Sequence, residues 1–248
     1  MRELRIVARI RSDFPEKFGI PRQSGLVPQT RARVVLEPPY DNPDALRGIE
    51  GFSHLWLIWL FSESEREGWS PTVRPPRLGG NTRMGVFATR SPFRPNPIGL
   101  SCVTLEGVEA HGPHGVSLLV GGADLMDGTP ILDIKPYHPL SDCHPDARGG
   151  FASARADYAV AVEFPPELEA LVPQEKREAL RGVLAGDPRP AYQNDSGRLY
   201  GVAFAGKNVR FTVENGVLTV RGVEESRRDR YGSIKKASRR FSGVFVRQ

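Results

Sequence analysis

The sequence predicts a mainly β protein of the α+β class, in which strands outnumber helices. Short segments of alternating or continuous apolar residues recur through residues 1–150, separated by loops rich in proline and glycine. Strands and helices do not alternate along the chain, which argues against a doubly wound parallel sheet. Only one long segment, Pro166–Leu184, has the apolar spacing of a helix, and Gly186 ends it.

Residues 1–150 contain the expected strands of a first domain. The segment His54–Phe61 (HLWLIWLF) is continuously apolar, so we expect a strand that is buried on both faces. Long loops at Pro71–Thr82 and Pro92–Gly99 interrupt the strands, and long ordered loops are commonly functional. The expected strands are Arg5–Arg11, Arg31–Glu37, His54–Phe61, Met84–Arg90, Ile98–Val108, Gly115–Val120 and Thr129–Lys135.

The chain is expected to divide near residues 145–160, which are small, polar and rich in glycine. A strand at Ala159–Phe164 and the helix follow, and then a meander with turns at Gly206–Asn208 and Asn215–Gly216. The strands of the meander are Leu199–Phe204, Val209–Glu214 and Val217–Val223. We therefore expect a first domain of residues 1–150, a small α+β domain of residues 151–223 and a C-terminal extension of residues 224–248.

Composition excludes several classes of protein. Hydrophobic residues make up 39% of the chain and charged residues 25%, as in ordinary globular proteins. The longest apolar run, His54–Phe61, is far shorter than the ~20 residues of a membrane-spanning helix. The N-terminus has no continuous apolar stretch of a secretory signal. Two cysteines cannot form a disulfide framework, and we expect a protein of the reducing cytoplasm.

The positive charge of the chain is concentrated at its end. The chain carries a net charge of +5, whereas residues 221–248 hold nine Lys or Arg and three acidic residues. Such asymmetry suggests a polyanionic partner, most often a nucleic acid, although a solubilising tail has the same composition.

One segment comes close to a phosphate-binding loop. Gly201–Asn208 (GVAFAGKN) nearly matches GxxxxGK[ST], but Asn208 replaces the hydroxyl residue that holds magnesium. The segment is also flanked by strand-like sequence on both sides, so a hairpin turn is the better interpretation. There is no GxGxxG pattern for a dinucleotide and no GxSxG nucleophile elbow.

Histidines and cysteines give only weak indications of a metal site. His138, Cys143 and His144 lie close together, and His111 and His114 form a second pair. Neither set has four ligands at the spacing of zinc sites, so exposed loop histidines are the simpler interpretation.

The functional signal lies in loops that combine arginines, prolines, glycines and single carboxylates. Prolines fix their backbone φ near −65° and stiffen these segments, so that side chains such as Arg90, Arg94 and Asn96 lose little entropy on binding a ligand. The loops are Ile20–Leu26, Pro71–Asn81, Thr89–Gly99 and Asp127–Pro139. Four such loops within one domain predict a shared binding site.

At these loops the chain resembles the TrmO (TsaA-like) family of tRNA adenine-N6 methyltransferases. The matching words are EKFGIPRQSGLV at Glu16–Val27, RGIEGFSHLW at Arg47–Trp56, GWSPTVRPPRLGGNTRMGVFATRSPFRPNPIG at Gly68–Gly99 and DGTPILDIKPYHP at Asp127–Pro139. A looser match covers DPRPAY at Asp187–Tyr192 and the sequence Asn208–Arg210. The resemblance spans residues 1–223, and the extension beyond lies outside it.

The resemblance implies a single-sheet β-barrel that binds S-adenosylmethionine, in place of the Rossmann-type methyltransferase core. Its expected reaction is methylation of N6 of N6-threonylcarbamoyladenosine at position 37 of tRNA, beside the anticodon. It also implies a homodimer, and a small C-terminal domain that helps to hold tRNA. The cofactor residues that it implies are Pro21, Arg22, Gln23, Ser62, Glu63, Arg90, Leu100, Asp127, Gly128, Thr129 and Pro130.

The substrate N6 is a poor nucleophile because its lone pair is delocalised into the purine ring and the carbamoyl group. We expect Asp133 to accept the N6 proton and Tyr137 to stack on the base or hydrogen-bond to it. Asn96 is an alternative acceptor, because an amide oxygen beside N6 localises the lone pair without taking the proton. A structural role for the Asp133 carboxylate remains open.

Binding of the modified tRNA is assigned to two groups of cations. Arg94 or Lys135 is expected to pair with the carboxylate of the threonylcarbamoyl group. Basic clusters of the extension, with Tyr231 and Phe241 between them, suit phosphates and splayed bases of an RNA loop. These clusters are Arg227, Arg228, Arg230, Lys235, Lys236, Arg239 and Arg240. Two other functions compete: a catalytically silent RNA-binding barrel, and a metal-dependent hydrolase that uses Asp127 or Asp133.

Overall fold

The structure is a computed structural model that describes residues 4–64, 68–75, 82–151, 158–189, 195 and 197–226. Its larger part is a closed six-stranded barrel in the order β1-β2-β7-β6-β3-β8, with every neighbouring pair antiparallel. The strands are β1 (Ala8–Arg11), β2 (Arg31–Leu36), β3 (His54–Leu60), β6 (Ile98–Gly112), β7 (Gly115–Gly121) and β8 (Pro130–Pro136). The predicted mainly β class and single-sheet barrel are confirmed.

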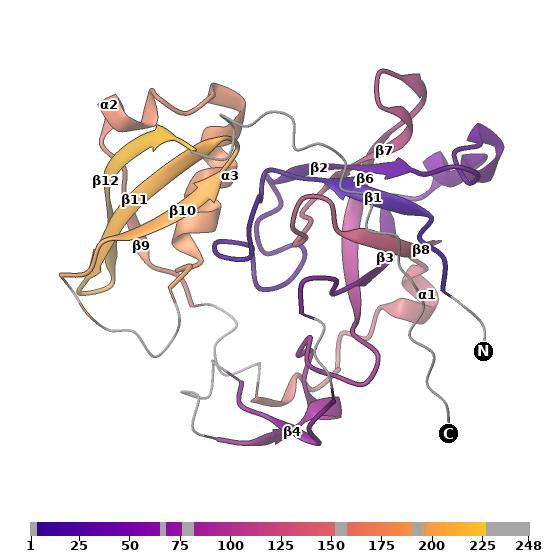
Figure 1. Ribbon diagram of the computed structural model, residues 1–248, viewed down its shortest axis with the longest axis horizontal. Coiled ribbons are helices and arrows are strands. Elements are labelled where there is room, and N and C mark those ends of the chain that lie inside the picture. Colours follow the sequence, from indigo (N-terminus) through magenta and orange to yellow (C-terminus); the bar gives the residue numbers. More distant parts are fainter. Residues whose placement is uncertain are drawn as a thin grey trace.

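A smaller part lies beside the barrel (Figure 1). It is a sheet in the order β10-β11-β12-β9, in which β9 runs parallel to β12. Its elements are β9 (Ala161–Glu163), α2 (Pro166–Glu169), α3 (Gln174–Ala185), β10 (Tyr200–Phe204), β11 (Lys207–Glu214) and β12 (Val217–Glu225). A short pair, β4 (Thr72–Val73) and β5 (Met84–Gly85), forms a separate arm, and α1 (Pro139–Asp142) follows β8.

The apolar segment His54–Phe61 is not buried on both faces. Along β3, Leu55, Leu57 and Trp59 point into the barrel and are buried, whereas the alternate residues are only half-buried. A closed antiparallel barrel has one interior face, so successive side chains alternate between the core and the outer surface.

The single expected helix is two helices. Helix α2 ends at Glu169, and α3 begins at Gln174 after Pro173, which occupies its N-cap. Proline lacks the N–H that a continuing helix needs, and it disfavours helical backbone in the residue before it.

The expected strand Met84–Arg90 is also shorter than predicted. Strand β5 ends at Gly85, and Val86–Ala88 forms a 3-10 turn that the Thr89 backbone N–H closes on the Val86 carbonyl. The Thr89 hydroxyl donates to the same carbonyl at 2.8 Å. Strand β5 therefore ends where the two hydrogen bonds from Thr89 to the Val86 carbonyl close a turn.

The hairpin interpretation of Gly201–Asn208 is confirmed, because the segment forms β10, a tight turn and the start of β11. Ala205 and Gly206 occupy the turn with φ of 47° and 77°. Asn215 and Gly216 have φ of 50° and 78° in the turn before β12. Positive φ at both central residues is the geometry of the turns that join antiparallel strands.

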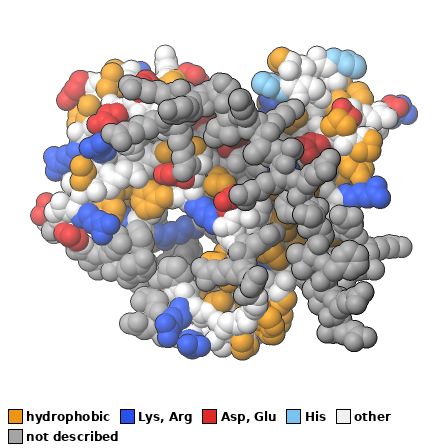
Figure 2. Space-filling view, viewed as in Figure 1, with side chains coloured by type: hydrophobic (Ala, Val, Ile, Leu, Met, Phe, Trp, Pro, Cys, Tyr) orange, Lys and Arg blue, Asp and Glu red, His pale blue; other side chains and the backbone are white. Residues whose placement is uncertain are grey.

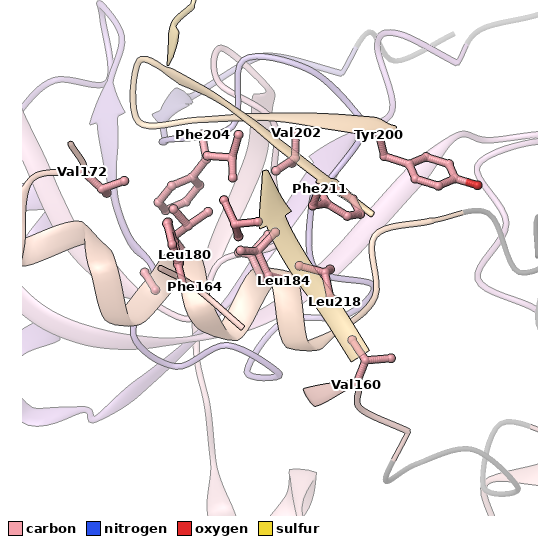
Figure 3. Close-up of a cluster of buried hydrophobic side chains, with 14 of the residues drawn as sticks. Val160, Phe164, Val172, Leu180, Leu184, Tyr200, Val202, Phe204, Phe211 and Leu218 are labelled. Carbon is pink, nitrogen blue, oxygen red and sulfur yellow. The ribbon is translucent and has the colours of Figure 1, made fainter. Parts of the chain in front are cut away.

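Two hydrophobic cores hold the molecule together, and the second uses residues from the start of the chain. Phe164, Leu180 and Leu184 pack beneath β10–β12 (Figure 3). Phe14 and Val27, from the loop between β1 and β2, are buried in the same cluster. Lys176 of α3 also pairs with Asp13 at 2.6 Å. This loop thus connects the barrel to the smaller part.

No helix among the described residues is long and apolar enough to cross a membrane. Strand β12 continues to Glu225, past the expected boundary at 223. The basic clusters from Arg227 onward lie outside the described residues.

Candidate functional site

A cavity of about 660 Å³ opens at one end of the barrel. Its walls come from the loop between β1 and β2, the end of β3, the segment after the arm, the start of β6 and the turn before β8. The volume lies within the ~300–1,000 Å³ range of small-molecule sites. Three of the four loops of the predicted shared site line the cavity, namely Ile20–Leu26, Thr89–Gly99 and, through Thr129, Asp127–Pro139. Residues 76–81 of the fourth loop lie outside the described residues.

Three side chains joined in a row by hydrogen bonds form the floor of the cavity at the open end of the barrel. Trp59 Nε1 donates to Ser101 Oγ at 2.9 Å, and Ser101 Oγ donates to Asp124 Oδ1 at 2.5 Å. Trp59 packs against Phe61 with ring centroids 4.2 Å apart. The row places a carboxylate next to two aromatic rings, so the cavity combines an apolar wall with a fixed acceptor.

Gly99 makes room for the indole of Trp59. The two residues are paired across β3 and β6, and a Cβ atom at Gly99 would lie 2.3 Å from Trp59 Cε2. No side chain fits there without moving the ring. Glycine at this position is therefore a packing requirement of the cavity floor.

Asp124 is a half-buried carboxylate with a raised pKa. Desolvation by burial raises the pKa of its carboxyl, although hydrogen bonds from Ser101 and backbone N–H groups and the charge of Arg90 oppose the shift. A desolvated carboxylate that faces a cavity is suited to accept hydrogen bonds from ligand hydroxyls or to pair with a cation.

Cationic side chains surround the mouth of the cavity. Arg90 Nη1 donates to Gln23 Oε1 at 2.5 Å, and Arg94 Nη1 donates to the Thr89 carbonyl at 3.1 Å. Lys17 Nζ donates to the Glu63 carbonyl and to Ser64 Oγ. The mouth is therefore suited to a ligand with an anionic end.

Arg22 connects the cavity to the smaller part of the molecule. Its Nη2 donates to the Asp187 carbonyl oxygen at 3.0 Å. Asp187 is itself buried, receives bonds of 2.8 and 2.9 Å from Arg189, and accepts a hydrogen bond from the Tyr158 hydroxyl at 2.9 Å. Asp187 and Arg189, from the matching word DPRPAY, thus support a residue of the cavity wall.

Most of the expected cofactor residues meet at the cavity. The residues that line it are Pro21, Arg22, Gln23, Ser62, Glu63, Arg90, Leu100 and Thr129. The other three, Asp127, Gly128 and Pro130, do not line it. The Asp127 carboxylate accepts from the Ser12 N–H at 3.1 Å and lies 3.7 Å from Arg11, so it closes the turn on β1 and is directed away from the cavity.

The expected catalytic residues are separated in the structure. Asn96 and Arg94 line the cavity. Asp133 lies on the outer face of β8 and is paired with Lys135 at 2.9 Å, and its other oxygen accepts from the Ile134 N–H. Lys135, one of the two cations expected to bind the substrate, therefore neutralises Asp133, the carboxylate expected to accept the N6 proton.

Tyr137 lies further along the same outer face, where its ring is 5.8 Å from that of Trp56. Desolvation and the neighbouring Cys143 raise the pKa of its hydroxyl, which keeps the phenol protonated. Neither Tyr137 nor Lys135 lines the cavity.

Sequence reasoning missed Asp124, Trp59, Met126 and Lys17, which all line the cavity. Asp124 lies three residues before Asp127 in the same segment, so the sequence indicated this segment, and the carboxylate in it that lines the cavity is Asp124. Among the described residues, no group of three or more His, Cys, Asp and Glu side chains is placed to hold a metal ion.

Comparisons with known proteins identify the family. Residues 9–143 match the model of the tRNA-methyltransferase O N-terminal domain, and residues 157–226 match the TrmO C-terminal domain. The tRNA (adenine(37)-N6)-methyltransferase of Escherichia coli K12 is 48% identical over 223 residues, which cover 87% of this chain and 94% of that protein. A putative S-adenosylmethionine-dependent methyltransferase, RcsF, of Pseudomonas aeruginosa is 47% identical over 204 residues, 79% of this chain and 86% of that protein.

The fold agrees with these sequence matches. A crystal structure of TrmO from Pseudomonas aeruginosa superposes with a TM-score of 0.73 at 38% identity, covering 91% of this chain and 98% of that one. The two family models together span both parts of the structure, the barrel with its cavity and the four-stranded sheet. The chain belongs to the TrmO family.

Proposed function

We propose that the chain transfers a methyl group from S-adenosylmethionine to N6 of adenine 37 in tRNA, and that its substrate adenosine already carries the threonylcarbamoyl group. The observation that carries this proposal is the convergence of eight expected cofactor residues and Asn96 on one cavity. Membership of the TrmO family supports the cofactor and the tRNA substrate.

The side chains of the cavity fit the parts of S-adenosylmethionine. Trp59 and Phe61 offer an apolar wall for the adenine, and Asp124 offers acceptors for the ribose hydroxyls. Arg22 and Arg90 offer donors for the methionine carboxylate. When bound, the cofactor supplies an electrophilic methyl group on its sulfonium.

Asn96 is the residue of this chain best placed to prepare the nucleophile. Asn96 lines the cavity, and its backbone carbonyl accepts a hydrogen bond from the Ile98 N–H at 2.7 Å, which fixes the backbone of the loop. An amide oxygen that accepts the N6–H localises the nitrogen lone pair, and the N6 proton passes to water as the new C–N bond forms, because the amide itself does not take it. Transfer of a methyl group in line depends mainly on such positioning.

Arg94 is the better placed of the two cations expected to read the threonylcarbamoyl carboxylate. It lines the cavity together with Asn96, and its bond to the Thr89 carbonyl fixes the guanidinium there. Lys135 is paired with Asp133 on the outer face of the barrel. We therefore propose Arg94 as the partner of the modification.

A methyl-transfer assay with labelled S-adenosylmethionine tests the function. tRNA that carries the threonylcarbamoyl group is the substrate, and the same transcript without the group is the control. We expect label at N6 of adenine 37 in the first and little in the second. Binding of tRNA without any methyl transfer would contradict the proposal and indicate a silent RNA-binding barrel.

The acceptor assignment has its own test. In Asn96→Ala we expect kcat to fall by ~10²–10³, the usual effect of removing one hydrogen bond that acts in the transition state. Asp133→Asn is the matched variant, and its kcat is expected to stay within a few-fold of the parent. Both should retain S-adenosylmethionine affinity, measured by calorimetry. Loss of turnover in Asp133→Asn alone would assign the role to Asp133.

We also propose that the enzyme is a cytoplasmic homodimer. Leu100, 47% exposed, lies on the outer face of the barrel beside Ile58, the residue to which it is paired across β6 and β3. An apolar side chain in this position suits contact with a second copy. Light scattering of the purified chain tests the dimer, and a monomer mass at micromolar concentration would contradict it.

A further inference from the structure

The arm formed by β4 and β5 carries two large aromatic side chains in water. Trp69 is 57% exposed and Phe87 is 73% exposed. Their ring centroids are 6.4 Å apart with an angle of 33° between the planes, so together they form one apolar surface. Burial of such rings is strongly favourable, and a protein that keeps two of them exposed side by side usually binds something there.

The backbone beneath these rings is held by local hydrogen bonds. The Val86 N–H donates to the Pro71 carbonyl at 2.9 Å, and the Val86 side chain is buried. Arg83 Nη1 donates to Thr72 Oγ1 at 3.1 Å across the two strands. The aromatic pair is therefore presented by a fixed frame, which lowers the entropy cost of binding.

The charged side chains in the described residues of the arm and of the segment after it are all arginines. The described residues 68–75 and 82–97 contain Arg74, Arg83, Arg90 and Arg94 and no Asp or Glu. None of these arginines forms an ion pair with another described residue. In the lower part of Figure 2, where Figure 1 places β4, the coloured side chains are Lys or Arg (blue) and hydrophobic residues (orange), and no Asp or Glu (red) is seen among them.

The aromatic pair lies next to the cavity along the chain. Phe87 precedes Thr89, a cavity residue, by two positions, which is at most ~7 Å of extended backbone. A nucleotide whose base enters the cavity therefore leaves its neighbours in the strand close to Trp69 and Phe87. Positive charge beside exposed rings is the combination that binds single-stranded nucleic acid, in which bases stack on rings and cations neutralise phosphates.

We propose that the arm binds nucleotides of the anticodon loop that flank the target adenosine. Trp69 and Phe87 stack on the flanking bases, and Arg74 and Arg83 pair with the phosphates between them. This inference rests on the proposed function for the identity of the RNA. It assigns to the arm a binding surface separate from the cofactor cavity.

The test measures the affinity of full-length chain variants for threonylcarbamoylated tRNA. We expect Trp69→Ala and Phe87→Ala each to raise the Kd for tRNA at least fivefold, the lower end of a lost base–aromatic stack. Trp69→Phe, which keeps a ring, should recover most of the affinity. Leu140→Ala is the matched control, because Leu140 is a fully exposed apolar side chain outside the arm.

The charges are tested separately. Arg74→Gln with Arg83→Gln should flatten the slope of log Kd against log salt by ~1.5, at ~0.7–0.9 for each phosphate contact. S-adenosylmethionine affinity should be unchanged in all these variants. Turnover at saturating tRNA should also be kept, so that the defect appears in KM.

Two results would overturn the proposal. In the first, tRNA affinity is unchanged in Trp69→Ala and Phe87→Ala although both variants fold. In the second, tRNA affinity is unchanged but the mass in light scattering halves, which would assign the arm to contact between copies of the chain. Because the readout is binding, an inactive parent that nevertheless loses tRNA on arm substitution would contradict the proposed reaction and still support the arm.

Discussion

Asp124 and Asp127 lie three residues apart in one segment, yet their carboxylates have opposite surroundings. Asp124 receives the Ser101 hydroxyl within the cavity, and Asp127 receives the Ser12 N–H outside it. The sequence shows two carboxylates of the same kind before Gly128. Which one enters the cavity depends on the path of the turn, in which Gly128 adopts a φ of 80°, and side-chain composition does not encode that direction.

We expect Asp124→Asn to stabilise the fold at neutral pH and to weaken cofactor binding. The pKa of Asp124 is raised in the folded state, so its ionised form costs stability above that pKa. The cost disappears as the pH falls toward the unfolded value of 3.8. Denaturant midpoints of variant and parent should therefore differ at pH 8 and converge toward acid pH. S-adenosylmethionine affinity should fall about tenfold or more, the usual effect of losing a hydrogen bond to a charged group.

Asp127→Asn serves as the control for this prediction. Its carboxylate contacts Ser12 and Arg11, so the variant should keep cofactor affinity within a few-fold. An unchanged affinity in Asp124→Asn together with a loss in Asp127→Asn would assign the ribose site to Asp127.

At the scale of elements, the sequence predicts the positions of the strands better than it predicts where they end and which of their side chains are buried. The run His54–Phe61 was recognised as a strand, but apolar outer residues such as Ile58 hid the alternation that a barrel imposes. The helix was recognised and its break at Pro173 was not, because apolar residues continue on both sides of the proline. Closure of the barrel is a long-range property, and only the resemblance to a family anticipated it.

Gly99 at the start of β6 gives a prediction at this scale. In Gly99→Ala the new methyl group would lie 2.3 Å from the Trp59 ring, which is fixed by its bond to Ser101. We expect a loss of ~1–3 kcal/mol in unfolding free energy, as for other overpacked sites. The displaced ring should also weaken S-adenosylmethionine binding, as measured by calorimetry.

The matched control is Gly107→Ala on the same strand. There the nearest atom to the new Cβ is Leu119 Cδ1 at 3.4 Å, an ordinary contact. This variant should retain cofactor affinity and most of the stability. Equal losses in the two variants would mean that glycine is needed along β6 in general, and not for the indole.

At the scale of the whole molecule, the loop between β1 and β2 belongs to both parts of the structure. Its ends, Phe14 and Val27, are buried in the second core, and the cavity residues Pro21, Arg22 and Gln23 lie between them. The sequence predicts a division near residue 150, but it gives no periodic signal for two isolated apolar residues that pack in a distant core. The smaller part therefore helps to shape the cofactor cavity as well as to extend the molecule.

Asp187→Asn should weaken the support that the smaller part gives to the cavity residue Arg22. Asparagine tolerates the φ of 49° at this position, so the variant removes the charge and keeps the backbone. Burial opposes ionisation of Asp187, but the bonds from Arg189 and Tyr158 outweigh it and lower the pKa. The ionised carboxylate therefore contributes stability above the unfolded pKa, and this contribution is lost as the pH falls through the folded pKa.

We expect a lower denaturation midpoint for Asp187→Asn at pH 7, and a difference from the parent that shrinks in acid, opposite in sign to that of Asp124→Asn. Cofactor affinity should fall less than stability, because Arg22 donates to the backbone carbonyl of Asp187, which the variant retains, and only the side-chain bonds that hold this carbonyl in place are weakened. Lys176→Met, which removes a different pair between the two parts, should lower stability with little effect on cofactor affinity. Equal cofactor losses in both variants would make the effect a general loosening of the contact between the parts.

The last prediction concerns the net charge of the chain and its basic end, whose residues from Arg227 onward lie outside the described residues. Removing Arg227–Gln248 takes away eight Lys or Arg and one Asp, so the net charge changes from +5 to −2. Long-range attraction of tRNA should weaken accordingly, whereas Arg74 and Arg83 of the arm and Arg90 and Arg94 at the cavity remain. If four to six of the removed charges contact phosphates, the slope of log affinity against log salt should flatten by about 3–5, at ~0.7–0.9 per contact. S-adenosylmethionine affinity should not change.

Replacement of the seven clustered Lys and Arg by Gln, with Phe241 and Phe245 kept, separates charge from the rest of the segment. An unchanged salt slope in both variants would leave recognition of the RNA backbone to the arm and the cavity rim.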